Sequence, residues 1–295
     1  MLFRSVPPKV NQMTFFDAFI NNCNPPVAPA PTNTQNVVVY DADGSITNAI
    51  LGAGQNTMVI GFAGAVCIST APSNRLTRGR AVLNGRFIDG LPLPPDLPSD
   101  KYQEVFVHEF GHLIGLDHSQ INMEIFKGQN DTDTLCGIPL MFPVLFRNVG
   151  SRTALGCLPL AADDEAWVSS LYPDASFAAT FGRIEGNVVF SDGQTPVQGT
   201  NLIARLQDDP VTTGVNESRR FAYSSTSGFL FTGNPGQSAT ASYLPCTPSN
   251  DPDCTGGFFG NNTAGGTFGS RDSALIGFYQ IPLKPDRKSV VRERV

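Results

Sequence analysis

The stretch that decides how this sequence is interpreted is His108-Glu109-Phe110-Gly111-His112-Leu113-Ile114-Gly115-Leu116-Asp117-His118. All three histidines of the chain lie within it. His108 and His112 are four residues apart, so a helix would place both imidazoles on one face. His118 would face away from a continuing helix, so the chain must leave the helix before it. Gly115 stands where that turn is needed, because glycine tolerates the left-handed conformation that ends helices.

Three histidines that converge in this way are typical of a catalytic zinc site. Three neutral imidazoles leave one tetrahedral position open, and a water bound there has its pKa lowered toward about 7. Glu109 follows the first ligand, and its carboxylate can accept the proton of that water and pass it to a departing amine. The pattern therefore predicts peptide-bond hydrolysis through a zinc-bound water, with Glu109 as general base and His108, His112 and His118 as ligands.

This eleven-residue pattern resembles the signature of the metzincin zinc metallopeptidases, H-E-x-x-H-x-x-G-x-x-H. That family also has a downstream Met-turn, and Pro139-Leu140-Met141-Phe142-Pro143 is similar to one. The resemblance implies that Met141 lies beneath the histidines as an apolar floor, without binding the metal, and that Pro143 supports the turn. The alternative for Met141 is ordinary filling of a core.

Two further features resemble the matrixin branch of that family. Ser119 follows the third histidine, and residues 160–172 (LAADDEAWVSSLY) are similar to the matrixin C-terminal helix with its pair of aspartates. The resemblance implies that one of Asp163 and Asp164 hydrogen-bonds beneath the Met-turn, whereas the other meets the mature N-terminus. The alternative is that both are acids favoured by the helix dipole in a first turn. No histidine is left for the structural zinc of matrixins, while calcium sites built from carboxylates and carbonyls stay an open alternative.

In matrixins the substrate pairs as an extra strand with the edge of the sheet above the cleft, and main-chain hydrogen bonds hold it. The expected edge is 60–66, with Gly64 and Ala65 as candidate substrate-binding residues, because a glycine permits close approach of another backbone. A plain core strand is the alternative. By the same resemblance, 140–157 walls the pocket for the residue after the cleaved bond.

The resemblance implies an α+β fold for the catalytic part, with a twisted mixed sheet, an active-site helix and a C-terminal helix. Residue patterns predict three strands, at 37–40, 58–69 and 80–88. They also predict a turn at 41–44, a helix from 99 or 100 through His112, irregular structure over 119–160, and a helix over 161–171.

After about residue 177 the texture of the sequence changes, because short strand-like runs alternate with Gly, Asn, Asp and Ser clusters. We therefore expect a matrixin-like peptidase domain over 1–176, an all-β accessory module over 180–286 and a disordered basic tail over 287–295. Gly and apolar spacing in the module resembles carboxypeptidase-regulatory-like β-sandwich domains, and a generic β-sandwich is the alternative. A stabilising or substrate-tethering role follows only from analogy between folds.

The chain has six cysteines, and none falls in a C-x-x-C pair. An even number without metal-type spacing predicts disulfides and an oxidising compartment, with buried free thiols as the alternative. We therefore expect a secreted, extracellular protein, although the first eight residues hold no apolar run that would form a signal peptide. Six cysteines allow 15 pairings, of which the most economical set is Cys136–Cys157, Cys246–Cys254 and Cys23–Cys67.

The composition excludes several classes of partner. The net charge is -6 and no basic stripe occurs in the body of the chain, which argues against nucleic acid and against a polybasic membrane anchor. No apolar stretch approaches the length of a transmembrane helix. The 41% hydrophobic residues support a buried core, while 29 glycines and 23 prolines favour a loop-rich and strand-rich fold. The expected partner is a protein or peptide substrate, and the expected state is a monomer.

Two other functions fit parts of the sequence. One is a surface-binding or adhesive protein in which the metal site is structural or a relic. The other is a peptidase of narrow specificity that acts on cell-wall peptides or on its own precursor. Glu109 weighs against a relic, because a purely structural metal site has no need of a base.

Overall fold

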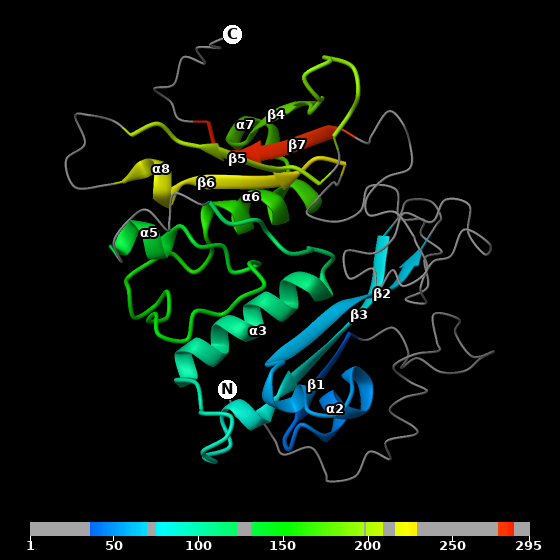
Figure 1. Cartoon of the computed structure of the whole chain (residues 1–295), viewed down its shortest axis with the longest axis vertical. Coiled ribbons are helices and arrows are strands. Elements are labelled where there is room, and N and C mark those ends of the chain that lie inside the picture. Colours follow the sequence, from blue (N-terminus) through cyan, green and yellow to red (C-terminus); the bar gives the residue numbers. More distant parts are fainter. Residues whose placement is uncertain are drawn as a thin grey trace. The chain divides into compact units, whose positions relative to one another are not determined.

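The protein is described here from a computed structural model (Figure 1). The contacts divide the chain into two units, Met1–Gly115 and Leu116–Val295, and each is considered by itself. Helices and strands occur in both units, so the protein belongs to the α+β class, as predicted. The structure describes residues 36–69, 75–122, 131–197, 199–208, 216–228 and 277–285.

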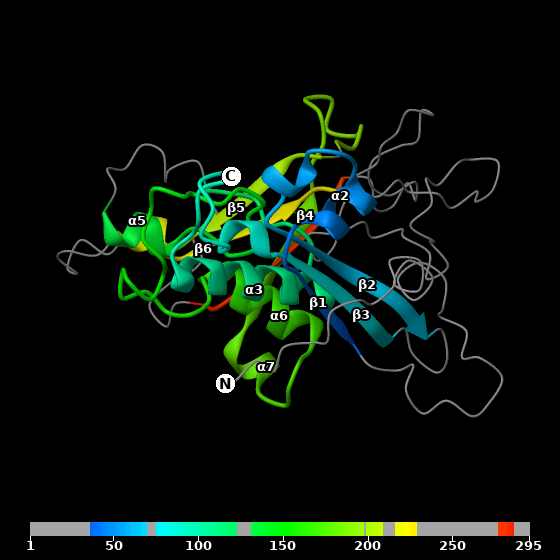
Figure 2. The same cartoon turned by 90° about the horizontal axis from the view of Figure 1, so that it is seen from below.

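Three strands and one long helix form the framework of the first unit (Figures 1 and 2). Its elements are β1 (Val37–Asp41), α2 (Ser45–Leu51), η1 (Gln55–Thr57), β2 (Gly61–Ser69), β3 (Arg75–Asn84), η2 (Gly85–Phe87) and α3 (Ser99–Leu113). β3 lies between the other two strands, parallel to β1 and antiparallel to β2. Among the described strands, β2 is therefore at an edge of the sheet.

Helix α3 packs on β2 and β3, and a glycine permits the closest part of this contact. A Cβ added to Gly79 of β3 would lie 2.4 Å from the carbonyl oxygen of Leu113, far inside van der Waals contact. The last turn of α3 can therefore lie directly on the strand. Val105 and Leu113 of the helix are buried, and three consecutive residues of β3, Ala81, Val82 and Leu83, have no exposed surface.

Helix α2 was not predicted from the sequence, which indicated only a turn at 41–44. Gly44 does adopt a left-handed conformation, with φ 73°. The carboxylate of Asp41 then accepts hydrogen bonds from the N–H groups of Ile46 and Thr47, at 3.2 and 2.7 Å. The turn thus satisfies backbone donors of the first helical turn, and a helix follows it directly.

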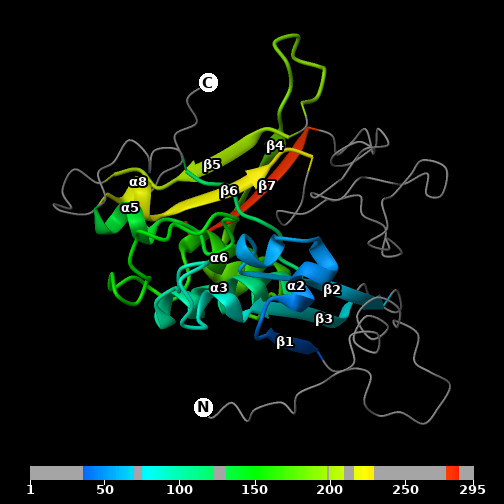
Figure 3. The ribbon, with the colours of Figure 1, turned by 60° about the horizontal axis from the view of Figure 1, so that its bottom comes forward.

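The second unit combines helix α6 with two antiparallel strand pairs (Figure 3). Its elements are α5 (Thr132–Cys136), α6 (Ala162–Leu171), α7 (Phe177–Thr180), β4 (Gly182–Asn187), β5 (Asn201–Arg205), α8 (Glu217–Arg220), β6 (Ala222–Thr226) and β7 (Phe278–Leu283). β4 pairs with β7, and β5 pairs with β6. Helix α6 contacts both β6 and β7. Ala166, Tyr223 and Ile281 form one buried core between these elements.

This core contains residues from both sides of the domain boundary that we expect near 176–180. The division that the contacts do show falls between Gly115 and Leu116. In its described part, the expected module over 180–286 contains β4 to β7 and the single helical turn α8, while α7 lies at the expected boundary. Its assignment as a β-sandwich stays a prediction, and the expected tail over 287–295 lies outside the described residues.

The predicted disulfide between Cys136 and Cys157 is present, with the two Cα atoms 5.4 Å apart. It joins the end of α5 to the loop that precedes α6. Helix α5 lies inside 119–160, where we expected irregular structure, so that prediction was wrong for these five residues. The other proposed pairs lie outside the described side chains, since they involve Cys23, Cys67, Cys246 and Cys254. In the described part of the chain, no helix has the length and apolar character needed to cross a membrane.

Candidate metal centre and active site

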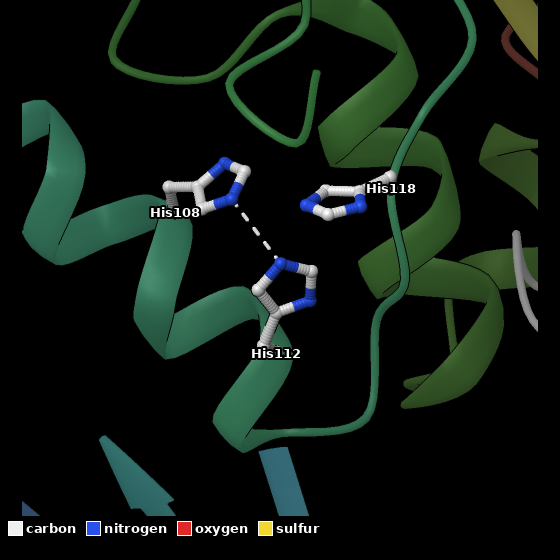
Figure 4. A group of neighbouring side chains, drawn as sticks. All are labelled: His108, His112 and His118. Atoms are coloured by element: carbon white, nitrogen blue, oxygen red, sulfur yellow. Dashed lines mark hydrogen bonds between the residues drawn. The ribbon is translucent and has the colours of Figure 1, made fainter. Parts of the chain in front are cut away.

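The three histidines of the chain point toward one another (Figure 4). One nitrogen atom from each ring lies within 4.8 Å of those of the other two. The Nε2 atoms of His108 and His112 are 3.1 Å apart, and the two rings are nearly perpendicular, at 88°. His118 is 7% exposed, and the other two rings are partly buried. The histidines therefore form one cluster.

The local fold explains how residues six apart in sequence meet. Helix α3 ends at Leu113, and Gly115 has φ 100°, a left-handed conformation that favours glycine. The N–H of Gly115 donates to the carbonyl of His112 at 3.0 Å, which closes the last turn. Beyond Gly115 the chain forms no helix or strand up to His118, whose N–H donates to the carboxylate of Asp117 at 2.7 Å. His118 thus faces the two helical histidines instead of continuing around the helix axis.

The donor set of this cluster fits a divalent transition metal. Two imidazole nitrogens on a tetrahedral zinc lie about 3.3 Å apart, because each Zn–N bond is about 2.0–2.1 Å. The 3.1 Å between the Nε2 atoms of His108 and His112 is close to that value. Imidazole also suits copper, iron and nickel, so the geometry selects a class of metal and not one element.

Glu109 has an unusual environment for a carboxylate. Its side chain is 4% exposed, and burial raises its pKa to about 8. Among the described residues, its Oε2 atom has no hydrogen-bond partner. A buried carboxylate oxygen without a partner is costly unless a ligand, water or cation completes it. A nearby divalent cation would lower this pKa by favouring the charged form.

The carboxylate of Glu109 lies directly against the backbone of β2, at a residue that the sequence analysis missed. A Cβ added to Gly61 would lie 2.8 Å from Oε1 and 2.9 Å from Cγ of Glu109. Only a glycine leaves room for the carboxylate in this position. Gly61 lies inside the predicted edge strand 60–66, but no local signal distinguishes it from Gly64.

Gly61→Ala is expected to reduce activity about 10- to 100-fold while the protein still binds metal, since small displacements of a catalytic group have effects of this size. The added methyl would push the carboxylate of Glu109 aside without touching a histidine. Hydrolysis rates and bound metal should be measured together. Gly182→Ala is the matched control, because a Cβ at this strand glycine meets nothing within 4 Å. Equal activities for the two variants would contradict the role of Gly61.

An aspartate of α6 holds the turn that contains Met141. The carboxylate of Asp164 accepts the N–H groups of Leu140 at 2.8 Å and Met141 at 3.0 Å. The carbonyl of Met141 accepts the N–H of Ser119 at 2.9 Å. Met141 is 3% exposed and shares a buried cluster with Leu116 and Trp167. The turn is therefore bonded to the segment that carries His118.

Asp163 has different partners. Its carboxylate accepts both the N–H and the hydroxyl of Ser224 in β6, as well as a hydrogen bond from Ser119. Burial raises its pKa to about 7. The N-terminal partner implied by the matrixin resemblance falls on residues outside the described ranges.

The other residues predicted for the site have no hydrogen bond or contact with the histidine cluster among those described above. Gly64 and Ala65 pair with Arg80 and Gly79 of β3, on the edge strand β2. Pro143 is exposed in the loop after Met141. The pKa of Asp117, next to the third histidine, is raised to about 6 by burial. The calcium sites that were left open stay a prediction.

No protein-family model, no curated protein and no solved structure matches the chain. The resemblance to metzincins therefore depends on the motifs of the sequence, above all the H-E-x-x-H-x-x-G-x-x-H pattern.

Proposed function

We propose that this chain is a secreted zinc metallopeptidase of the metzincin type, with a matrixin-like catalytic part. The observation that carries the proposal is the convergence of His108, His112 and His118, together with a buried carboxylate, Glu109, that follows the first of them on α3. The Cys136–Cys157 disulfide is compatible with an oxidising compartment and hence with secretion.

The three imidazoles would hold the metal. A zinc ion bound there supplies a Lewis acid for the scissile carbonyl and lowers the pKa of a coordinated water. Glu109 would accept a proton from the attacking water and donate it to the departing amine. Its burial and its packing on Gly61 hold the carboxylate in one place, and its Oε2, which has no hydrogen-bond partner among the described residues, is the atom available for the proton.

Edge strand β2 would bind the substrate. A peptide could add to its free edge through main-chain hydrogen bonds, which accept many sequences. The proposed substrate is therefore an extended segment of a protein or peptide, and the edge alone does not separate broad from narrow specificity.

Metal removal tests this function. The purified chain is expected to contain about one zinc per molecule, as three-histidine catalytic sites do. It should cleave an unstructured protein such as casein. Dialysis against a chelator should abolish cleavage, and added zinc should restore it, because the proposed mechanism depends on the metal as its Lewis acid. Zinc content by mass spectrometry and cleavage by gel electrophoresis are the measurements.

His118→Ala, purified in parallel, controls for adventitious metal and for contaminating peptidases. It should lose both zinc and activity, because two imidazoles on one helix hold the ion far more weakly than three. A parent protein that binds no zinc and cleaves nothing would argue for the surface-binding alternative, and cleavage that survives the chelator would contradict a metal-dependent mechanism.

A further inference from the structure

We infer that Ser224, in strand β6 beyond the expected domain boundary, is a positioning residue for the third histidine. The C-terminal strands would then help to position a ligand of the metal site, and would not form an independent accessory module. This inference depends on the proposed metal site and concerns how that site is held in place.

Ser224 uses all of its polar groups on two segments that adjoin the site. Its N–H and its hydroxyl both donate to the carboxylate of Asp163 in α6. Its hydroxyl oxygen accepts the N–H of Gln120 at 3.1 Å, and its carbonyl accepts the indole N–H of Trp167 at 2.8 Å. Ser224 is 2% exposed, so water does not compete for these bonds.

These bonds reach His118 by a short path within one unit. Gln120 is two residues beyond His118, and its backbone is bonded directly to Ser224. Ser119, the residue next to His118, hydrogen-bonds to Asp163, which Ser224 also contacts. The backbone on the C-terminal side of the histidine is thus held at two consecutive residues.

The consequence concerns the cost of assembling the site. His118 lies on an irregular segment outside α3, so the helix does not position it as it positions His108 and His112. Without outside contacts this segment would have to be ordered when the metal binds, and that ordering weakens binding. The network of Ser224 and Asp163 orders it beforehand. Partners of this kind typically change metal affinity or activity by about 10- to 100-fold.

Serine variants in the full-length chain test the inference. Ser224→Ala removes the hydroxyl that bonds Asp163 and Gln120, and it should raise the dissociation constant for zinc about tenfold. Asp163→Asn weakens the same hydrogen bonds from the side of α6, and it should also raise the dissociation constant for zinc. Ser225→Ala is the matched control, because Ser225 is 1% exposed and its Oγ has no hydrogen-bond partner in the described part of the chain. Its zinc affinity should stay within about twofold of the parent, since no bond is lost.

Zinc affinity should be measured by competition with a chromogenic chelator, at a temperature where circular dichroism shows each variant folded. If Ser224→Ala does not fold, the zinc affinity of Asp163→Asn tests the inference by itself. Parental affinity in both network variants, or equal weakening in Ser225→Ala, would overturn the inference and leave the proposed function intact. A parent protein that binds no zinc would remove the metal site itself and the inference with it.

Discussion

Glu109→Gln is expected to bind zinc as the parent protein does and to lose about 100- to 10,000-fold in the rate of hydrolysis, the usual contribution of general acid–base catalysis. The substitution keeps the shape of the side chain and removes only its ability to take up a proton. The three histidines are untouched. A neutral amide also suits the buried position at least as well as a carboxylate does. The expected loss is therefore in kcat, with little change in stability.

The measurements are zinc content, kcat and KM on an unstructured protein, and the unfolding midpoint. Glu185→Gln is the matched control, because it removes an exposed carboxylate of β4 by the same chemical change. It should leave all four quantities at their parental values. If Glu109→Gln retained parental kcat, another group would have to be the base. If it lost its zinc, the two effects could not be separated.

The sequence predicted the parts of this site that depend on local spacing. Histidines four apart on a helix and a glycine three residues later are patterns that a short segment carries by itself. The extent of α6 was also predicted to within one residue, because its acidic first turn and the following proline mark both ends. Four short helices were missed, namely α2, α5, α7 and α8. Helix α5 has an aspartate N-cap and a glycine after it, but five residues are too few for a hydrophobic period.

The parts that were not predicted depend on contacts between distant segments. Gly61 meets Glu109 across 48 positions only because β2 pairs with β3 under α3. Ser224 bonds Gln120 across 104 positions. A serine in a strand and a glycine at the start of one have ordinary local roles, so neither residue type indicates a site. Both contacts arise from the packing of segments that are distant in sequence, and the periodicity of hydrophobic residues does not contain this information.

Asp163 and Asp164 were predicted in part, because their position in the helix is a local feature and their burial depends on distant segments. Two acids in the first turn of a helix have a local explanation, the helix dipole, and Asp164 does accept the N–H of Ala161 at 3.0 Å, as capping acids do. Both carboxylates are nevertheless almost fully buried, at 1% and 3% exposed. The dipole alone would leave them in water. Their burial follows from the backbone donors of the Met141 turn and of β6, which the sequence did not place beside them.

The largest expected effect on stability follows from this burial. Asp164→Ala should lower the free energy of unfolding by at least about 3 kcal/mol, since each buried donor left without a partner costs about 1–3 kcal/mol. Three N–H groups would lose their acceptor, those of Leu140, Met141 and Ala161. Asp164→Asn should cost less. Its single carbonyl oxygen can still accept from Leu140 and Ala161, which share Oδ2, while its amide would face the N–H of Met141.

Urea unfolding measures this series, and the midpoint should fall in the order parent, Asp164→Asn, Asp164→Ala with an unchanged slope. Glu165→Ala is the control from the next position of α6. Glu165 pairs with Lys284, but both side chains are about 40% exposed, so the pair contributes only about 0–1 kcal/mol. Equal midpoints for Glu165→Ala and Asp164→Ala would mean that water replaces the carboxylate at the Met141 turn. The predicted order instead requires that water does not reach the three N–H groups, which is expected because Asp164 is 3% exposed and Met141 packs in a buried cluster with Trp167 and Leu116.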